Sequence, residues 1–106
     1  MTRSVAMVVR QCKSVLAQHY GDRFAGVVLY GSVARGRAQA DSDIDLLILL
    51  RGPFNTFEEL QRIVDLLYPV QLECERLISA KPVPLEDFER GSIQLYRNAK
   101  REGIWV

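Results

Sequence analysis

The sequence predicts a small α/β (α+β) domain in which helices pack on a mixed β-sheet. The chain has 106 residues, which is the length of one domain, and we expect residues 1–106 to form a single domain. Hydrophobic residues make up 48% of the chain and charged residues 25%, and these values argue against a disordered chain. Short apolar runs rich in β-branched residues alternate with longer segments whose apolar residues recur at helical spacing.

The N-terminal half predicts a helix, a strand and a polar turn. Apolar side chains recur at helical spacing from Val5 to His19, and Gly21 is well placed to end that helix. The next apolar run, residues 26–30, is short and bounded by glycines, as a buried strand would be. Residues 33–41 are small, polar and basic, which favours one helical turn followed by a loop.

The second predicted strand, Asp43 to Leu50, has apolar side chains on both faces beyond Asp45. We therefore expect a central strand that is covered on both sides. Asn55 is a plausible N-cap for the helix that follows. The core residues expected on that helix are Phe57, Leu60, Ile63, Val64 and Leu67.

The C-terminal third predicts one more strand and two helices. The strand is expected over residues 70–79 and a proline-containing loop over residues 81–84. A short helix is expected over residues 85–90. A last helix is expected between Ser92 and Gly103.

Charge and cysteine content exclude several classes of protein. Fourteen Lys and Arg residues against thirteen Asp and Glu residues give a net charge of +1, so nucleic acid is not the expected partner. Cys12 and Cys74 stand in no metal-ligand spacing and the chain has one His, which argues against zinc. The longest apolar run, residues 46–50, is far below the ~20 residues of a membrane helix, and no signal peptide is visible. We expect a cytoplasmic protein with no membrane partner.

One block of sequence, Gly-Ser-Val-Ala-Arg-Gly at residues 31–36, predicts a phosphate-binding turn. Gly31 ends a strand where the backbone turns sharply and a ligand can approach closely. Successive N–H groups at such a turn can hold phosphate, and the Ser32 hydroxyl can add a hydrogen bond. Arg35 lies within one helical turn of Ser32, so its guanidinium can reach the same anion.

A second block, Ser-Asp-Ile-Asp-Leu at residues 42–46, places Asp43 and Asp45 side by side on one face of a strand. A hard divalent cation would relieve the repulsion between these two carboxylates, and Mg²⁺ is usually held by one or two carboxylates plus substrate phosphates. Capping of the strand end is the alternative. We count Ser42 with Gly31, Ser32 and Arg35 as nucleotide-binding residues. Together the two blocks predict a phosphoryl- or nucleotidyl-transfer site.

The two blocks resemble the signature of the nucleotidyltransferase superfamily related to DNA polymerase beta, and the whole chain is similar to its minimal members. The resemblance implies the polymerase beta-like fold. It implies that Gly-Ser holds the triphosphate of ATP or another nucleoside triphosphate, and that the Asp-x-Asp pair binds two Mg²⁺ ions. It also implies a third carboxylate on the next strand, which completes the metal site and helps to activate the acceptor.

This sequence departs from the family at that third carboxylate, where an Asp is usual. The candidates are Glu73 and Glu75, which would share one face of the strand expected over residues 70–79. We favour Glu75 as the catalytic and metal-binding third carboxylate, because residues 77–79 after it then align with the usual end of this strand in the family. Arg76 beside it could neutralise it. The site is then either an active one that tolerates Glu or one that binds nucleotide and transfers weakly or not at all.

The function expected is transfer of a nucleoside monophosphate, in the first instance AMP from ATP, to a hydroxyl of a partner macromolecule. The resemblance implies a helical HEPN-type partner protein and an antitoxin role in a toxin–antitoxin pair. The alternative is a catalytically weak or inactive nucleotide-binding module that acts by binding a partner protein. A homo-oligomer is compatible with either. Two aromatic residues stay open: Tyr30 either stacks on a base or packs, and Trp105 marks an interface or docks on the chain's own core.

Overall fold

The computed structural model describes residues 4–34, 36 and 42–106 and confirms the predicted mixed α/β fold. In chain order the elements are α1 (Val5–Tyr20), the 3-10 turn η1 (Gly21–Arg23), β1 (Phe24–Tyr30), α2 (Gly31–Ala34), β2 (Ile44–Leu50), α3 (Thr56–Leu72), β3 (Ile78–Pro84), α4 (Leu85–Arg90), α5 (Gln94–Glu102) and β4 (Ile104–Trp105). None of the helices in this described part is long and apolar enough to cross a membrane.

The strands form one sheet in the order β3-β2-β1-β4. β1 runs antiparallel to both β2 and β4, whereas β3 runs parallel to β2. The parallel pair requires a crossover, and α3 supplies it. The sheet is therefore mixed, as the sequence predicts.

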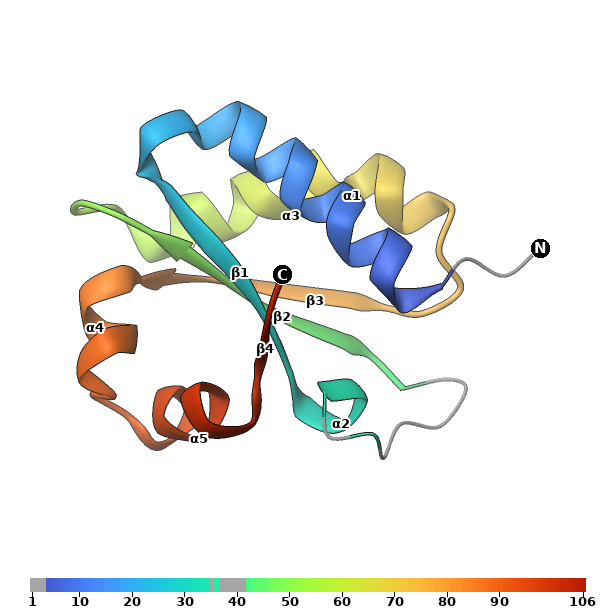
Figure 1. Cartoon of the computed structure of the whole chain (residues 1–106). Helices are drawn as coiled ribbons and strands as arrows, with labels where there is room; N and C mark the ends of the chain where they lie inside the picture. The colour runs from blue at the N-terminus through green and yellow to red at the C-terminus, as the bar shows by residue number, and fades with distance from the viewer. Residues whose placement is uncertain (1–3, 35, 37–41) are drawn as a thin grey trace.

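Helices cover both faces of the sheet (Figure 1). The even-numbered side chains of β2, from Ile44 to Leu50, pack in one cluster with α1 and α3. The odd-numbered Leu47 and Leu49 pack in a second cluster with Phe88 of α4 and Ala99 of α5. The prediction that β2 is a central strand covered on both sides is confirmed. Asp45 shares the second face, at the end of β2 where the strand begins.

The predicted boundaries of the two long helices are confirmed where caps define them. Ser4 accepts a hydrogen bond from the amide of Met7 at the start of α1, and Gly21 ends that helix. Asn55 accepts one from the amide of Glu58 at the start of α3. Polar side chains of this kind satisfy amides that have no partner within the helix.

The predicted third strand over residues 70–79 is wrong. α3 continues to Leu72, because Val70 follows Leu67 at helical spacing and both are buried against α1. Pro69 lies in the last turn of α3. The strand begins eight residues later than predicted and includes residues 81–84, which the sequence suggested as a loop.

The position of β3 at the sheet edge explains how a strand can contain Pro82 and Pro84. The amide of Ile44 donates to the carbonyl of Leu77 (2.8 Å), so the odd-numbered residues of β3 exchange hydrogen bonds with β2. The backbone nitrogens of the even-numbered Pro82 and Pro84 point away from β2, so the N–H group that proline lacks is not needed for pairing. Only an edge strand tolerates this.

The core face of α3 differs in part from the predicted one. Ile63 and Leu67 are buried as expected, and Val70 joins them, but Phe57 is 77% exposed and Val64 is 53% exposed. The apolar residues of α3 lie on two sides of the helix, and the sheet covers only the side with Ile63 and Leu67. Leu60 and Val64 instead line a groove beside β3.

Trp105 docks on the protein's own sheet although 55% of it is exposed. It lies in β4, opposite Val28 of β1, and its ring makes an edge contact with Phe88, with 5.9 Å between the ring centroids. A β-carbon on Gly26 would lie 2.8 Å from the indole ring. Of the two alternatives for Trp105, the structure shows docking on its own core.

Candidate active site

The site begins where β1 turns into α2 at Gly31. Gly31 has φ of 79°, a left-handed conformation that glycine adopts without strain. A β-carbon at this position would lie 2.5 Å from Oδ2 of Asp45. The turn that is expected to bind phosphate therefore lies directly against one of the paired carboxylates.

Asp45 lies inside β2 and Asp43 just before it, and their charges interact. Burial, and then the negative charge of Asp43, raise the pKa of Asp45 above its ordinary value of 3.8, while Lys81 opposes that change. Asp43 is exposed and Asp45 is partly buried. A cation bound at Asp45 would oppose both effects and favour its ionised form.

Tyr30 flanks the carboxylates on the other side. It pairs with Asp45 across the β1–β2 ladder and packs against the cluster that contains Leu47 and Phe88. Burial and the charge of Asp45 raise the pKa of the Tyr30 phenol. Its packing role is confirmed by these contacts, whereas stacking on a base stays a prediction.

The remaining nucleotide-binding candidates fall in two groups. Ser32 lies in α2 and Ser42 just before β2, and both are partly buried. The amides of the first turn of a helix lack partners within the helix, so Ser32 stands where phosphate oxygens could be held. Arg35 lies outside the described residues, and its expected role stays a prediction.

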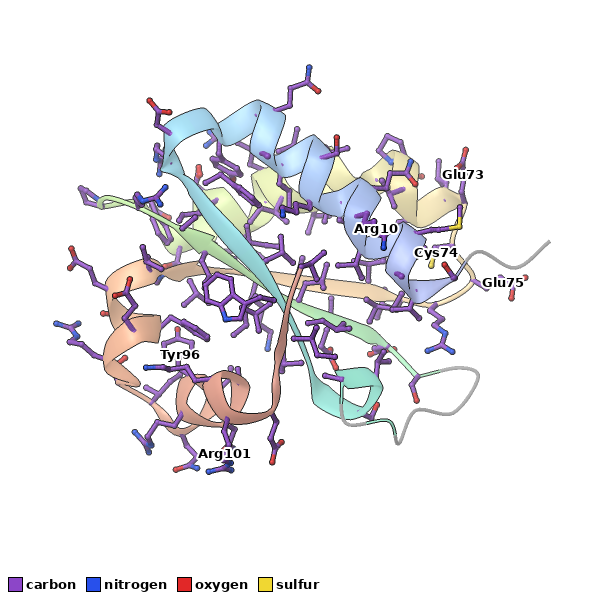
Figure 2. The ribbon with its side chains drawn as sticks, viewed as in Figure 1. Arg10, Glu73, Cys74, Glu75, Tyr96 and Arg101 are labelled. Atoms are coloured by element: carbon purple, nitrogen blue, oxygen red, sulfur yellow. The ribbon has the colours of Figure 1, made fainter. Side chains whose placement is uncertain are left out.

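The placement expected for Glu73 and Glu75 is wrong. Neither lies on a strand: both lie in the turn between α3 and β3, as Figure 2 shows, on the side of the sheet that α1 and α3 cover. Across residues 4–34, 36 and 42–106, no three His, Cys, Asp or Glu side chains gather closely enough to hold a metal ion. The structure therefore does not bring Glu75 to Asp43 and Asp45, because α3 extends through the segment that was expected to be a strand.

Sequence reasoning missed the residues that face Asp45 from β3. In the parallel register Ser79 lies opposite Asp45, and Lys81 lies opposite Leu47 on the same face. Ser79 falls at the end of the strand predicted over residues 70–79, whereas Lys81 falls in the proline-containing segment predicted as a loop. Once β3 is known, the register alone identifies both residues.

Asp43 and Asp45 supply the carboxylate oxygens that a divalent cation such as Mg²⁺ prefers. The Gly31 turn lies against Asp45, so a phosphate group held at that turn would be close to a cation held by the pair. When bound, such an ion neutralises charge on the phosphates. A third carboxylate is not in place among the described residues.

Comparison with known proteins places this geometry in a family. The family model described as a nucleotidyltransferase domain matches residues 9–106. A candidate protein adenylyltransferase of Methanocaldococcus jannaschii is 32% identical over 72 residues, which make up 68% of this chain and 72% of that protein. A crystal structure of a candidate nucleotidyltransferase from Sulfolobus solfataricus matches with a TM-score of 0.55 and 18% identity, over 95% of this chain and 83% of that one. At this identity the structural match supports the fold alone.

The fold and the match along nearly the whole chain define a transferase of the nucleotidyltransferase class. The chain belongs to the nucleotidyltransferase domain family and has the small size of its minimal members. The predicted resemblance and the enzyme class are thereby confirmed.

Proposed function

We propose that this protein transfers AMP from ATP to a hydroxyl group of a partner protein, with Mg²⁺ bound between Asp43 and Asp45. The observation that carries the proposal is the contact between the Gly31 turn and the Asp45 carboxylate. This contact supports the proposal, because it joins the turn expected to bind phosphate to the carboxylate pair expected to bind a cation. The name of the Methanocaldococcus jannaschii relative supports adenylyl as the transferred group and protein as the acceptor.

In the proposed reaction the acceptor oxygen forms a bond to the α-phosphorus of ATP. The bond between that phosphorus and the pyrophosphate group breaks, pyrophosphate leaves, and the hydroxyl proton passes to solvent. The Gly31–Ser32 turn holds the phosphates and fixes their orientation, while Asp43 and Asp45 hold the cation against them. Positioning and charge neutralisation account for most catalysis of this type.

The partner is proposed on the family resemblance. Small nucleotidyltransferases of this kind pair with a helical HEPN-type protein, and we extend to this chain the role of antitoxin, acting in the cytoplasm, that such a pairing implies. The near-neutral charge of the chain is compatible with a protein acceptor and does not favour long nucleic acid.

The direct test is transfer of radiolabel to a purified partner, beginning with the product of the neighbouring gene. Label from α-³²P-ATP should reach the partner when Mg²⁺ is present, whereas label from γ-³²P-ATP should not, because the γ-phosphate leaves with pyrophosphate. The variant Asp43→Asn/Asp45→Asn should lose transfer by at least about 100-fold. Asp65→Asn, a carboxylate on the exposed side of α3, serves as the matched control.

A second function, a nucleotide-binding module that works by binding its partner, is supported by one observation. The described residues supply two carboxylates to the site and no third. If this function is the right one, the wild-type protein transfers no label, and the Asp43→Asn/Asp45→Asn variant still binds the partner with unchanged affinity. Transfer by the wild type that the double variant loses would exclude it.

A further inference from the structure

Lys81 is the charged residue that β3 contributes to the face carrying Asp45. In the parallel register the β3 residue opposite Asp45 is Ser79, and the next residue on the same face is Lys81, opposite Leu47. Side chains at such positions stand next to one another. The strand adjacent to the carboxylates thus brings a positive charge to them.

Lys81 is exposed, on the strand at the edge of the sheet. Together with Leu47 and Tyr96, Lys81 lines a groove of about 510 Å³ between β3, α3 and α5. Its aliphatic stem can cover these apolar residues while the ammonium stays in water, as lysine side chains commonly do.

The formal charges on this face decide how many divalent cations it can accept. Among the described residues, Asp43 and Asp45 bring two negative charges to this face and Lys81 brings one positive charge, while Glu73 and Glu75 lie beyond the end of α3 (Figure 2). A cation at the two carboxylates gains from both of them. A second divalent cation on the β3 side would meet Ser79 and the ammonium, with no further carboxylate among the described residues to compensate the repulsion.

We propose that Lys81 brings a positive charge to the β3 side of the site, so that the chain binds one divalent cation with each nucleoside triphosphate instead of two. The inference rests on the proposed function, because it assumes that Asp43 and Asp45 bind a cation together with nucleotide. Lys81 is then a positioning residue: it sets how many cations bind, and it adds a positive charge near the acceptor group.

Mn²⁺ binding tests this inference without any measurement of transfer. The free Mn²⁺ signal in electron paramagnetic resonance is titrated with protein at saturating α,β-methylene-ATP, which cannot release pyrophosphate. Wild type and Lys81→Arg should each bind one Mn²⁺ per chain. Lys81→Asp should bind two, and Lys81→Met should bind its Mn²⁺ about three- to tenfold more tightly than wild type. Lys13→Met, which removes the same charge from α1 on the opposite face of the sheet, should match wild type.

The possible outcomes separate this inference from the proposed function. Two Mn²⁺ ions on the wild-type chain, or identical Mn²⁺ affinity for wild type and Lys81→Met, would overturn the inference and leave the proposed function standing. Equal Mn²⁺ binding by wild type and Asp43→Asn/Asp45→Asn would overturn both. Circular dichroism of each variant checks that the fold is retained, as expected for substitutions at an exposed residue.

Discussion

The α-carbon of Gly31 lies so close to the carboxylate of Asp45 that a β-carbon on Gly31 would be 2.5 Å from Oδ2. Contacts this short do not occur between real β-carbons and oxygen atoms. A side chain at position 31 would therefore require the Asp45 carboxylate or the turn to shift. Gly31 also has φ of 79°, so two separate physical reasons favour glycine here.

The variant Gly31→Ala should lose nucleotide binding by at least about tenfold, because the added methyl group displaces Asp45 or the turn. It should also cost more stability than strain at a left-handed residue alone, which is roughly 1–2 kcal/mol. Isothermal titration with α,β-methylene-ATP and urea unfolding measure the two effects.

Gly52→Ala is the matched control for that variant. Gly52 has φ of 80°, nearly the same as Gly31, but nothing lies within 4 Å of an added β-carbon. It should therefore show the backbone strain and keep nucleotide binding. Equal loss of stability in both variants, with binding retained in both, would contradict the contact between Gly31 and Asp45.

Two parts of the site could be predicted from the sequence, the strand with Asp45 and the turn at Gly31, because each depends on residues that are neighbours in the chain. The alternation along residues 43–50 predicts a central strand covered on both sides, and the structure confirms it. It also puts Asp45 in that strand and Asp43 just before it. The turn at Gly31 followed from the abrupt end of the preceding apolar run. These features depend on neighbouring residues, which sequence patterns report well.

The β3 side of the site could not be predicted, because it depends on tertiary pairing. The sequence predicts a strand from residue 70 and a loop at Pro82, yet α3 continues through Pro69 to Leu72 and Pro82 lies on a sheet edge. Both exceptions come from context that the local sequence does not contain. The resulting shift of the strand removed Glu75 from the site and introduced Lys81.

Divalent cations should stabilise this protein through Asp45. Mg²⁺ bound to the folded state alone raises the free energy of unfolding, by about 2.7 kcal/mol at a concentration 100 times its Kd. The midpoint of thermal unfolding should therefore rise with Mg²⁺ in wild type and stay constant in Asp45→Asn. Differential scanning calorimetry with and without EDTA makes the comparison. An equal rise in both proteins would place the bound ion elsewhere.

Without cations, Asp45→Asn should be more stable than wild type at pH 7. The pKa of Asp45 is raised in the folded state, so its ionised form costs stability at pH values above that pKa. The cost disappears as pH falls through the folded pKa towards the ordinary value of 3.8. The difference in free energy of unfolding between the two proteins should thus be largest near neutral pH and should shrink in acid. A difference that grows on acidification would show that Asp45 is stabilised as an anion.

Glu59 of α3 is 3% exposed, and its carboxylate forms an ion pair with Arg62 and accepts a hydrogen bond from Tyr20 of α1. Arg62 donates to both carboxylate oxygens, and the Tyr20 hydroxyl donates to Oε2 at 3.4 Å. Arg62→Ala leaves that carboxylate without its charged partner, and it should destabilise the fold by about 1–3 kcal/mol in urea unfolding. Because Arg62 is partly exposed, we expect less than the loss of a fully buried pair.

The double variant Glu59→Gln/Arg62→Ala should be more stable than Arg62→Ala alone, since the uncompensated charge is gone. Nucleotide binding should be unchanged in all of these variants, because Glu59 packs on the face of the sheet opposite Asp45. Strict additivity of the two single substitutions would show that the residues do not interact.

Trp105 is the single tryptophan of the chain, so its fluorescence reports the β4 edge directly. The indole lies over Gly26 and against Phe88, and a β-carbon on Gly26 would lie 2.8 Å from the ring. Gly26→Ala should therefore push the ring outward, shift its emission to longer wavelength and destabilise the fold by roughly 1 kcal/mol. Ile104→Ala, next to Trp105 and similarly exposed, should lower stability without moving the emission maximum. An unshifted spectrum in Gly26→Ala would mean that the indole does not rest on Gly26 in solution.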